Sequence, residues 1–161
     1  MLACMKRFGP LLALGMLAVL CLPLYLHAQE KSMSHTASGT FEVKMAPVQN
    51  GAADGLMRMS IDKQIHGGLE ATTRGEMLSG GDYKSGNAGY VAMETVTGTL
   101  DGKSGSFILQ HIATLHGGKP EMHITVTPGS GMGELAGIAG TFTIIIDAQG
   151  KHSYTFDYTL P

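Results

Sequence analysis

The sequence predicts an all-β fold, a single antiparallel eight-stranded barrel, and three observations lead to it. From Thr36 onward, short runs rich in β-branched and aromatic residues alternate with glycine-rich turns. No window keeps a helical period for three turns, so we expect no long helix. The turns are short, which favours pairing between neighbours in sequence. Closing such a meander into a barrel removes the edges that a long-stranded sheet would expose, whereas a flattened sandwich is the alternative.

The clearest single element is a hairpin between Gly89 and Gly118. Two β-rich runs flank the turn Asp101-Gly102-Lys103-Ser104-Gly105, and Asp-Gly between such runs is a strong hairpin signal. Glycines inside the runs, such as Gly75 and Gly98, are expected at bulges or barrel corners. The eight expected strands are, in order, Ala37–Met45, Leu56–Ile65, Leu69–Leu78, Gly89–Leu100, Ser106–Leu115, Met122–Thr127, Gly140–Asp147 and Ser153–Leu160.

Residues 1–28 have the pattern of a cleavable signal peptide. Lys6 and Arg7 precede an apolar core, and Leu26-His27-Ala28 suits signal peptidase. We therefore expect cleavage after Ala28, a flexible leader over 29–35, a β-barrel domain over 36–161, and a secreted or periplasmic protein. The apolar core is only about 12 residues long, which is short for a bilayer span. No membrane association is thus expected after cleavage, and an uncleaved anchor is the alternative.

Charge and cysteine content narrow the classes of partner. Cys4 and Cys21 both lie in the signal, so the mature chain is expected to have neither a disulfide nor a thiolate ligand. It keeps 9 basic and 13 acidic residues, and the basic ones are scattered singly, so nucleic acid is not an expected partner. No cofactor and no metal are expected. His111 and His123 lie on neighbouring predicted strands, either on opposite faces or about four residues apart, too far to share one ion.

Several segments together resemble a known family. They are Ala37–Val43, Lys63–Thr72, Gly75–Leu78, Gly89–Gly118, Gly133–Thr141 and Gly150–Tyr154. With these segments in this order, nearly the whole mature chain resembles the bacterial family called domain of unknown function 3224. The resemblance implies a small antiparallel barrel similar to that of allene oxide cyclase. It implies no activity, and therefore no catalytic residue.

Glu94 is the leading candidate for a functional residue. It is the only charged residue in its predicted strand, and alternation places it on one face with Tyr90 and Val96. Burial of that face would desolvate the carboxylate, raise its pKa and suit it to general acid or base chemistry. The alternative is a solvated residue, or one paired with Arg74 or a lysine.

The remaining candidates follow from the same alternation. Glu70 and Glu76 share a face with Arg74, which could pair with either. Gln110 and His111 are polar neighbours in an apolar strand and could orient a ligand oxygen or be hydrogen-bonded at an interface. The methionines are expected to be core filler. The candidate ligand-binding residues are Glu94, Glu70, Glu76, His111, Gln110 and Tyr90.

Two functions remain open. The first is an exported, noncatalytic barrel that binds a small apolar molecule or a protein partner. The second is a cyclase or isomerase acting on a flexible apolar substrate, which would need a buried, unpaired carboxylate in a cavity. A purely structural barrel with no cavity is a third reading. Both faces of the long hairpin are partly apolar, so a second copy of the chain is one candidate partner.

Overall fold

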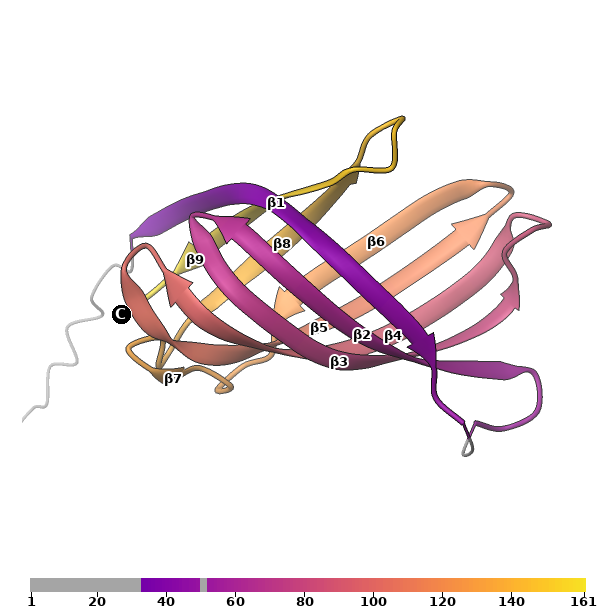
Figure 1. Ribbon diagram of the computed structural model, residues 1–161, viewed down its shortest axis with the longest axis horizontal. Helices are drawn as coiled ribbons and strands as arrows, with labels where there is room; N and C mark the ends of the chain where they lie inside the picture. Colours follow the sequence, from indigo (N-terminus) through magenta and orange to yellow (C-terminus); the bar gives the residue numbers. More distant parts are fainter. Residues whose placement is uncertain (1–32, 50–51) are drawn as a thin grey trace, which may run out of the picture.

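A computed structural model describes residues 33–49 and 52–161 as a closed antiparallel barrel of eight strands with a two-residue ninth strand beside it (Figure 1). The expected signal peptide, its cleavage site after Ala28 and both cysteines lie outside the described residues. The strands are β1 Ser34–Pro47, β2 Leu56–Gly67, β3 Leu69–Asp82, β4 Asn87–Leu100, β5 Lys103–His116, β6 Lys119–Val126, β7 Met132–Gly133, β8 Ala139–Ile146 and β9 His152–Thr159. In these two ranges no helix is long and apolar enough to cross a membrane.

The strand order confirms the predicted closed meander. It runs β4-β3-β2-β1-β9-β8-β6-β5, and β4 also pairs with β5, which closes the sheet on itself. Each expected strand is present, and the sandwich alternative is wrong. Strand β1 begins at Ser34, inside the expected leader, because Ser34 and His35 pair with Thr159 and Tyr158 of β9.

The turn between β4 and β5 is built on the expected Asp-Gly pair but is shorter than the expected five residues, because Lys103, Ser104 and Gly105 belong to β5. Leu100 pairs with Lys103, so the loop is only Asp101 and Gly102, with φ of 47° and 84°. Two positive φ values match the right-handed twist of the flanking strands. The register is continuous through Gly75 and Gly98, so the bulges expected there are absent.

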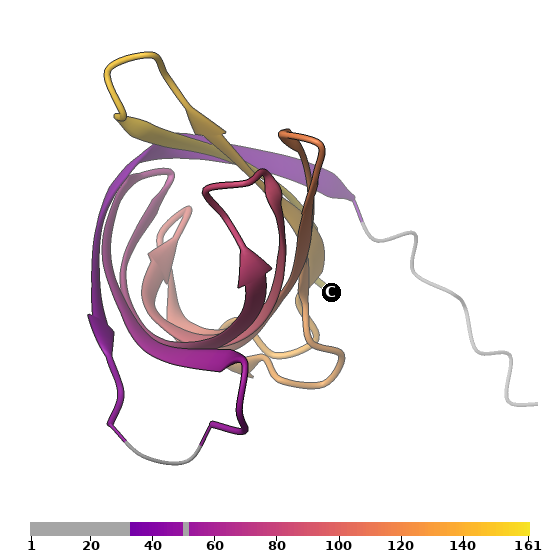
Figure 2. The same cartoon turned by 90° about the vertical axis from the view of Figure 1, so that its right-hand side faces the viewer.

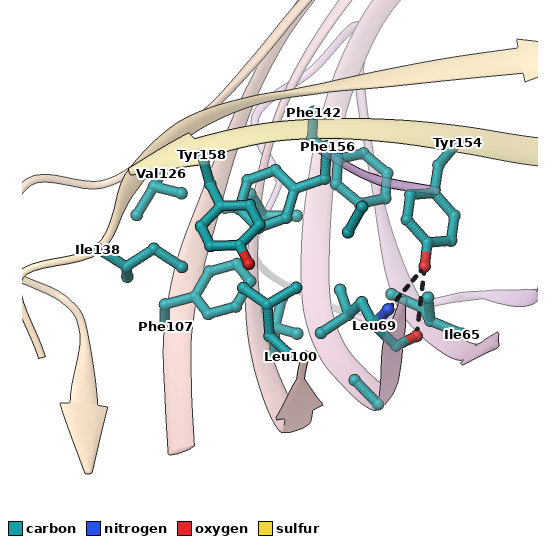
Figure 3. Packing of buried hydrophobic residues seen from close by; sticks show 14 of the residues in the cluster. Ile65, Leu69, Leu100, Phe107, Val126, Ile138, Phe142, Tyr154, Phe156 and Tyr158 are labelled. Carbon is teal, nitrogen blue, oxygen red and sulfur yellow. Dashed lines mark hydrogen bonds between the residues drawn. The ribbon is translucent and has the colours of Figure 1, made fainter. Parts of the chain in front are cut away.

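Aromatic side chains fill one half of the barrel (Figure 3). The rings of Phe107 and Phe156 stack with centroids 5.5 Å apart, and those of Phe142 and Tyr154 stack at 4.9 Å. The Tyr154 hydroxyl accepts a hydrogen bond from the Leu69 amide at 3.0 Å, which satisfies its polar end inside the core. This half, at the left of Figure 1, is here called the closed half.

The connection between β6 and β8, which contains β7, covers the closed half. Leu135 and Ile138 on this connection are 1% and 2% exposed and belong to the core. The glycine-rich stretch around them is thus a turn with a short strand.

Methionines lie at the other end, here called the open half, which faces the viewer in Figure 2. Alternation points Met45, Met57, Met59, Met77 and Met122 toward the barrel axis, yet each is exposed or half-buried. None of the eight methionines among the described residues is buried. The expectation that they fill the core is therefore wrong, because alternation sets the face of a side chain and not its depth along the barrel.

One seam of the barrel is much shorter than its neighbours. Strands β6 and β8 pair only through Thr125 and Thr141, whereas β5 with β6 and β8 with β9 each form eight residue pairs.

Candidate functional site

Four polar or charged side chains that are buried inside the barrel form one cluster. They are Lys63 of β2, Thr73 of β3, Glu94 of β4 and His111 of β5, and each is 6% exposed or less. They are the only buried polar or charged residues in the part of the chain that the structure describes. Because four consecutive strands each contribute one member, the cluster exists only when these strands are in register.

The register explains how the cluster meets at Glu94. Lys63 lies opposite Thr73, and Glu94 lies opposite Gly75, one inward position further along β3. A Cβ atom on Gly75 would stand 2.8 Å from Cγ of Glu94 and 2.3 Å from the carbonyl oxygen of Met93. Glycine at this position therefore gives the Glu94 side chain its room.

Both carboxylate oxygens of Glu94 have partners. Lys63 Nζ donates to Oε1 at 2.5 Å, and the Thr73 hydroxyl donates to Oε2 at 2.6 Å. His111 Nε2 stands 2.8 Å from Oε1, but the ring is turned so that Nε2 has no well-aligned hydrogen-bond partner. Lys63 Nζ also lies 5.2 Å from the centre of the Phe41 ring, a cation–π distance.

Two opposing effects, burial and the contacts with His111 and Lys63, determine the charge state of Glu94. Burial raises the pKa of Glu94, but the contacts with His111 and Lys63 outweigh it and lower the pKa to about 2. Burial of Glu94 is thus confirmed, whereas the expected unpaired carboxylate with a raised pKa is wrong. Of the alternatives, pairing with a lysine is the one the structure shows, and a carboxylate held ionised in this way cannot serve as a general acid near neutral pH.

Glu70 and Glu76 are not part of this cluster. Both point outward, with side chains 59% and 51% exposed. The Gly67 amide and His66 lower the pKa of Glu70, and Arg58 pairs with Glu76 at 2.6 Å. Neither glutamate contributes to the barrel interior.

The expected pairing of Arg74 with Glu70 or Glu76 is wrong. Arg74 Nε lies 3.6 Å from Asp62, the residue directly opposite it on β2. Directly opposed residues on paired strands have Cβ atoms about 5 Å apart, closer than alternate residues of one strand.

Tyr90 shares the inner face with the cluster, and Gln110 does not. Tyr90 is half-buried near the open half, and burial together with the charge of Glu94 raises the pKa of its hydroxyl. Gln110 points to the outer face, opposite to the direction of His111. Of the six candidates, the structure therefore groups Tyr90, Glu94 and His111.

A shallow depression of about 630 Å³ lies on the outer face of the same strands. The side chains that point outward into it are Arg58, Glu76, Leu78, Val91, Met93, Gln110 and Ile112. Val91, Met93 and Ile112 are 48–57% exposed, so this face is apolar at its centre. Whether a second copy of the chain covers it stays a prediction.

Lys63 and Thr73 are the functional candidates that sequence reasoning missed. Lys63 alternates with Ile61 and Ile65, both buried, so the period-2 pattern of β2 already places it inside. A lysine at an inward position was the available signal for a buried partner of Glu94.

Among residues 33–49 and 52–161, no three histidine, cysteine or acidic side chains lie close enough together to hold a metal ion. His111 points inward and His123 outward, because His111 pairs with Ile124 and Ile112 with His123.

Comparison with known proteins gives a family and a fold. The family model described as "Protein of unknown function (DUF3224)" matches residues 37–158. A crystal structure of a DUF3224 family protein of unknown function from Shewanella oneidensis MR-1 is similar, with 41% identity and a TM-score of 0.73. The match covers 80% of this chain and 98% of that one. No curated protein matches the chain.

Proposed function

This chain belongs to the DUF3224 family, and from that premise we propose that it is an exported protein that binds a small, mainly apolar molecule in the open half of its barrel. The likeness to the allene oxide cyclase barrel belongs to the same proposal, as a fold that can hold such a molecule. The enzyme alternative receives less support, since Glu94 is paired and its pKa is low.

The observation that carries the proposal is the exposed apolar lining of the inner face. Met45, Met57 and Met122 point inward and are still 40–58% exposed. Apolar side chains that face a barrel interior and are not packed against one another offer surface for another molecule to cover. Methionine suits such a lining, because its unbranched thioether chain adapts to ligands of different shape.

Polar groups at the base of this lining add the second feature of a small-molecule site. Such sites are mostly apolar with a few fixed polar groups that orient the ligand. Here Ser79, Tyr90 and His111 are inward-facing polar residues on the strands next to Met57, and Glu94 contacts both His111 and Lys63. The barrel interior thus changes from aromatic packing, through a charged cluster, to a methionine lining.

A matched pair of variants tests where the ligand binds. Met57 and Met93 are similarly exposed, 58% and 48%, but lie on the inner and outer faces. The neutral fluorescent probe N-phenyl-1-naphthylamine is titrated into the full-length chain and into Met57→Lys and Met93→Lys. We expect Met57→Lys to weaken binding by about tenfold, because the probe would meet a charge, and Met93→Lys to leave the Kd within about twofold.

The other outcomes oppose the proposal. Weakening by Met93→Lys alone would place the probe in the outer depression. Equal affinity of all three proteins would place it outside the barrel, and the absence of binding would remove the small-molecule function. As an independent measurement, native mass spectrometry of the protein purified from its own host shows whether a small molecule stays bound to it.

A further inference from the structure

We propose that the molecule bound in the barrel carries a hydroxyl group, an alcohol or a phenol, which donates a hydrogen bond to Nδ1 of His111. The inference rests on the proposed function and adds the chemical class of the ligand. It depends on two observations: Nε2 of His111 lies 2.8 Å from Glu94 Oε1, and Met77 and Met59 stand in the same layer of the inner face as His111.

Glu94 determines which nitrogen of His111 carries the proton. Nε2 faces the ionised Oε1 at 2.8 Å, and an unprotonated nitrogen at that distance would repel the oxygen, since both would be acceptors. The neutral ring is therefore the tautomer with hydrogen on Nε2. Its other nitrogen, Nδ1, is then a hydrogen-bond acceptor.

The fold prevents Glu94 from turning away from His111. Lys63 holds Oε1, Thr73 holds Oε2, and the space left by Gly75 accommodates the Glu94 side chain. The carboxylate is thus fixed from two strands, and the tautomer of His111 is fixed with it. This is the arrangement by which a carboxylate commonly orients an imidazole for its partner.

The inward side chains in the same layer as His111 offer no donor to Nδ1, and Tyr90 stands one inward position further along β4. The direct neighbours of His111 across β4 and β6 are Ala92 and Ile124, and the next inward residues in the same layer are Met77 and Met59. Alkyl groups donate nothing, and a thioether is only a weak acceptor. Nε2 is fully buried against Glu94, so Nδ1 is the ring nitrogen left for a ligand.

The charge balance selects a neutral donor. Lys63 and Glu94 cancel each other, so the cluster has no net charge with neutral His111. A carboxylate on the ligand would lie beside Glu94 with Lys63 already engaged, which is costly in a desolvated site. A hydroxyl group meets Nδ1 without this cost.

Two isosteric probes test the inference in the full-length chain. Competition with N-phenyl-1-naphthylamine gives the Kd of 2-naphthol, 2-methylnaphthalene and 2-naphthoate. We expect 2-naphthol to bind about tenfold tighter than 2-methylnaphthalene, the effect of one satisfied buried hydrogen bond, and 2-naphthoate to bind more weakly than either. His111→Leu should bring the naphthol-to-methylnaphthalene ratio close to one, and His111→Gln, whose carbonyl oxygen accepts, should restore part of it.

A measurement on the unmodified chain keeps the inference testable if His111→Leu fails to fold. Long-range proton–nitrogen correlation spectra of the free protein should show His111 protonated at Nε2 and unprotonated at Nδ1. The opposite tautomer would overturn the inference, as would equal binding of 2-naphthol and 2-methylnaphthalene or tighter binding of 2-naphthoate. In those cases apolar binding itself, and with it the proposed function, would stand. Failure of every probe to bind would instead remove the proposed function.

Discussion

The closed and open halves of the barrel are lined by the same strands but by different side chains. In the closed half, inward residues such as Phe107 and Phe156 are 0–1% exposed and pack on Leu135 from the covering connection. In the open half, inward residues such as Met57 and Met122 are 58% and 40% exposed. The Glu94 cluster lies between them.

The difference teaches that strand alternation does not by itself produce a core. Inward-facing residues become a core where other parts of the chain fill the remaining space, as the β6–β8 connection does. Where no segment of residues 33–49 and 52–161 does so, the same inward pattern produces a lining. The predictions below test this contrast, from the largest expected effect to the smallest.

Truncation of a side chain in the closed half should have the largest effect on the free energy of unfolding. Phe107→Ala removes a ring that is 1% exposed and stacked on Phe156. We expect a loss of roughly 3–5 kcal/mol in the free energy of unfolding, measured by urea denaturation. A loss below about 1 kcal/mol would mean that the closed half is not a close-packed core.

Acid should reduce the stability that Glu94, which lies between the two halves, contributes to the folded chain. The pKa of Glu94 is about 2 in the folded state against an ordinary 4.5, so between these values the unfolded state binds more protons. Its contribution, about 3 kcal/mol, is full above pH 4.5 and is lost as the pH falls toward 2. The free energy of unfolding should therefore differ less between pH 7 and pH 3 for Glu94→Gln than for the unmodified chain. Glu76→Gln, an exposed carboxyl change, should behave like the unmodified chain.

A smaller loss is expected from Gly75→Ala. The added methyl group would clash with the carbonyl oxygen of Met93 and stand 2.8 Å from Glu94 Cγ, so the β4 backbone or the Glu94 side chain must shift. We expect a loss of about 1–3 kcal/mol by thermal or urea unfolding. Gly89→Ala is the matched control, since its methyl group would meet nothing nearer than 3.4 Å. Equal losses in both variants would show that the effect is general to strand glycines.

Truncation in the open half should have the least effect on stability. Met57→Ala removes a side chain that is 58% exposed, so we expect a change within about 0.5 kcal/mol. The same urea measurement that detects Phe107→Ala serves here. A loss above about 1 kcal/mol would mean that Met57 packs as a core residue, and the contrast between the halves would disappear.

The sequence was sufficient for everything that alternation and turn chemistry determine. The barrel and the Asp-Gly pair of its β4–β5 turn follow from local patterns, and alternation groups Glu94 with Tyr90 on one face, but which face points inward stayed open. The pKa of Glu94 does not, because its partner Lys63 lies 31 residues away and meets it only in the folded register. The methionine lining was mistaken for core for a related reason, since depth along the barrel depends on which segments cover each end.

The single residue pair between β6 and β8 has a consequence for dynamics. Every other seam of the barrel is held by a ladder of at least eight pairs, so local opening requires the fewest broken hydrogen bonds between Thr125 and Thr141. The amides of β6 and β8 along this seam are therefore the ones that should exchange with deuterated solvent well before those of β3 and β4. Opening there would also lift the connection that carries Leu135 and Ile138 away from the aromatic rings. The barrel thus has two different boundaries: an end at which the inward side chains stay exposed, and a wall that parts only through a fluctuation.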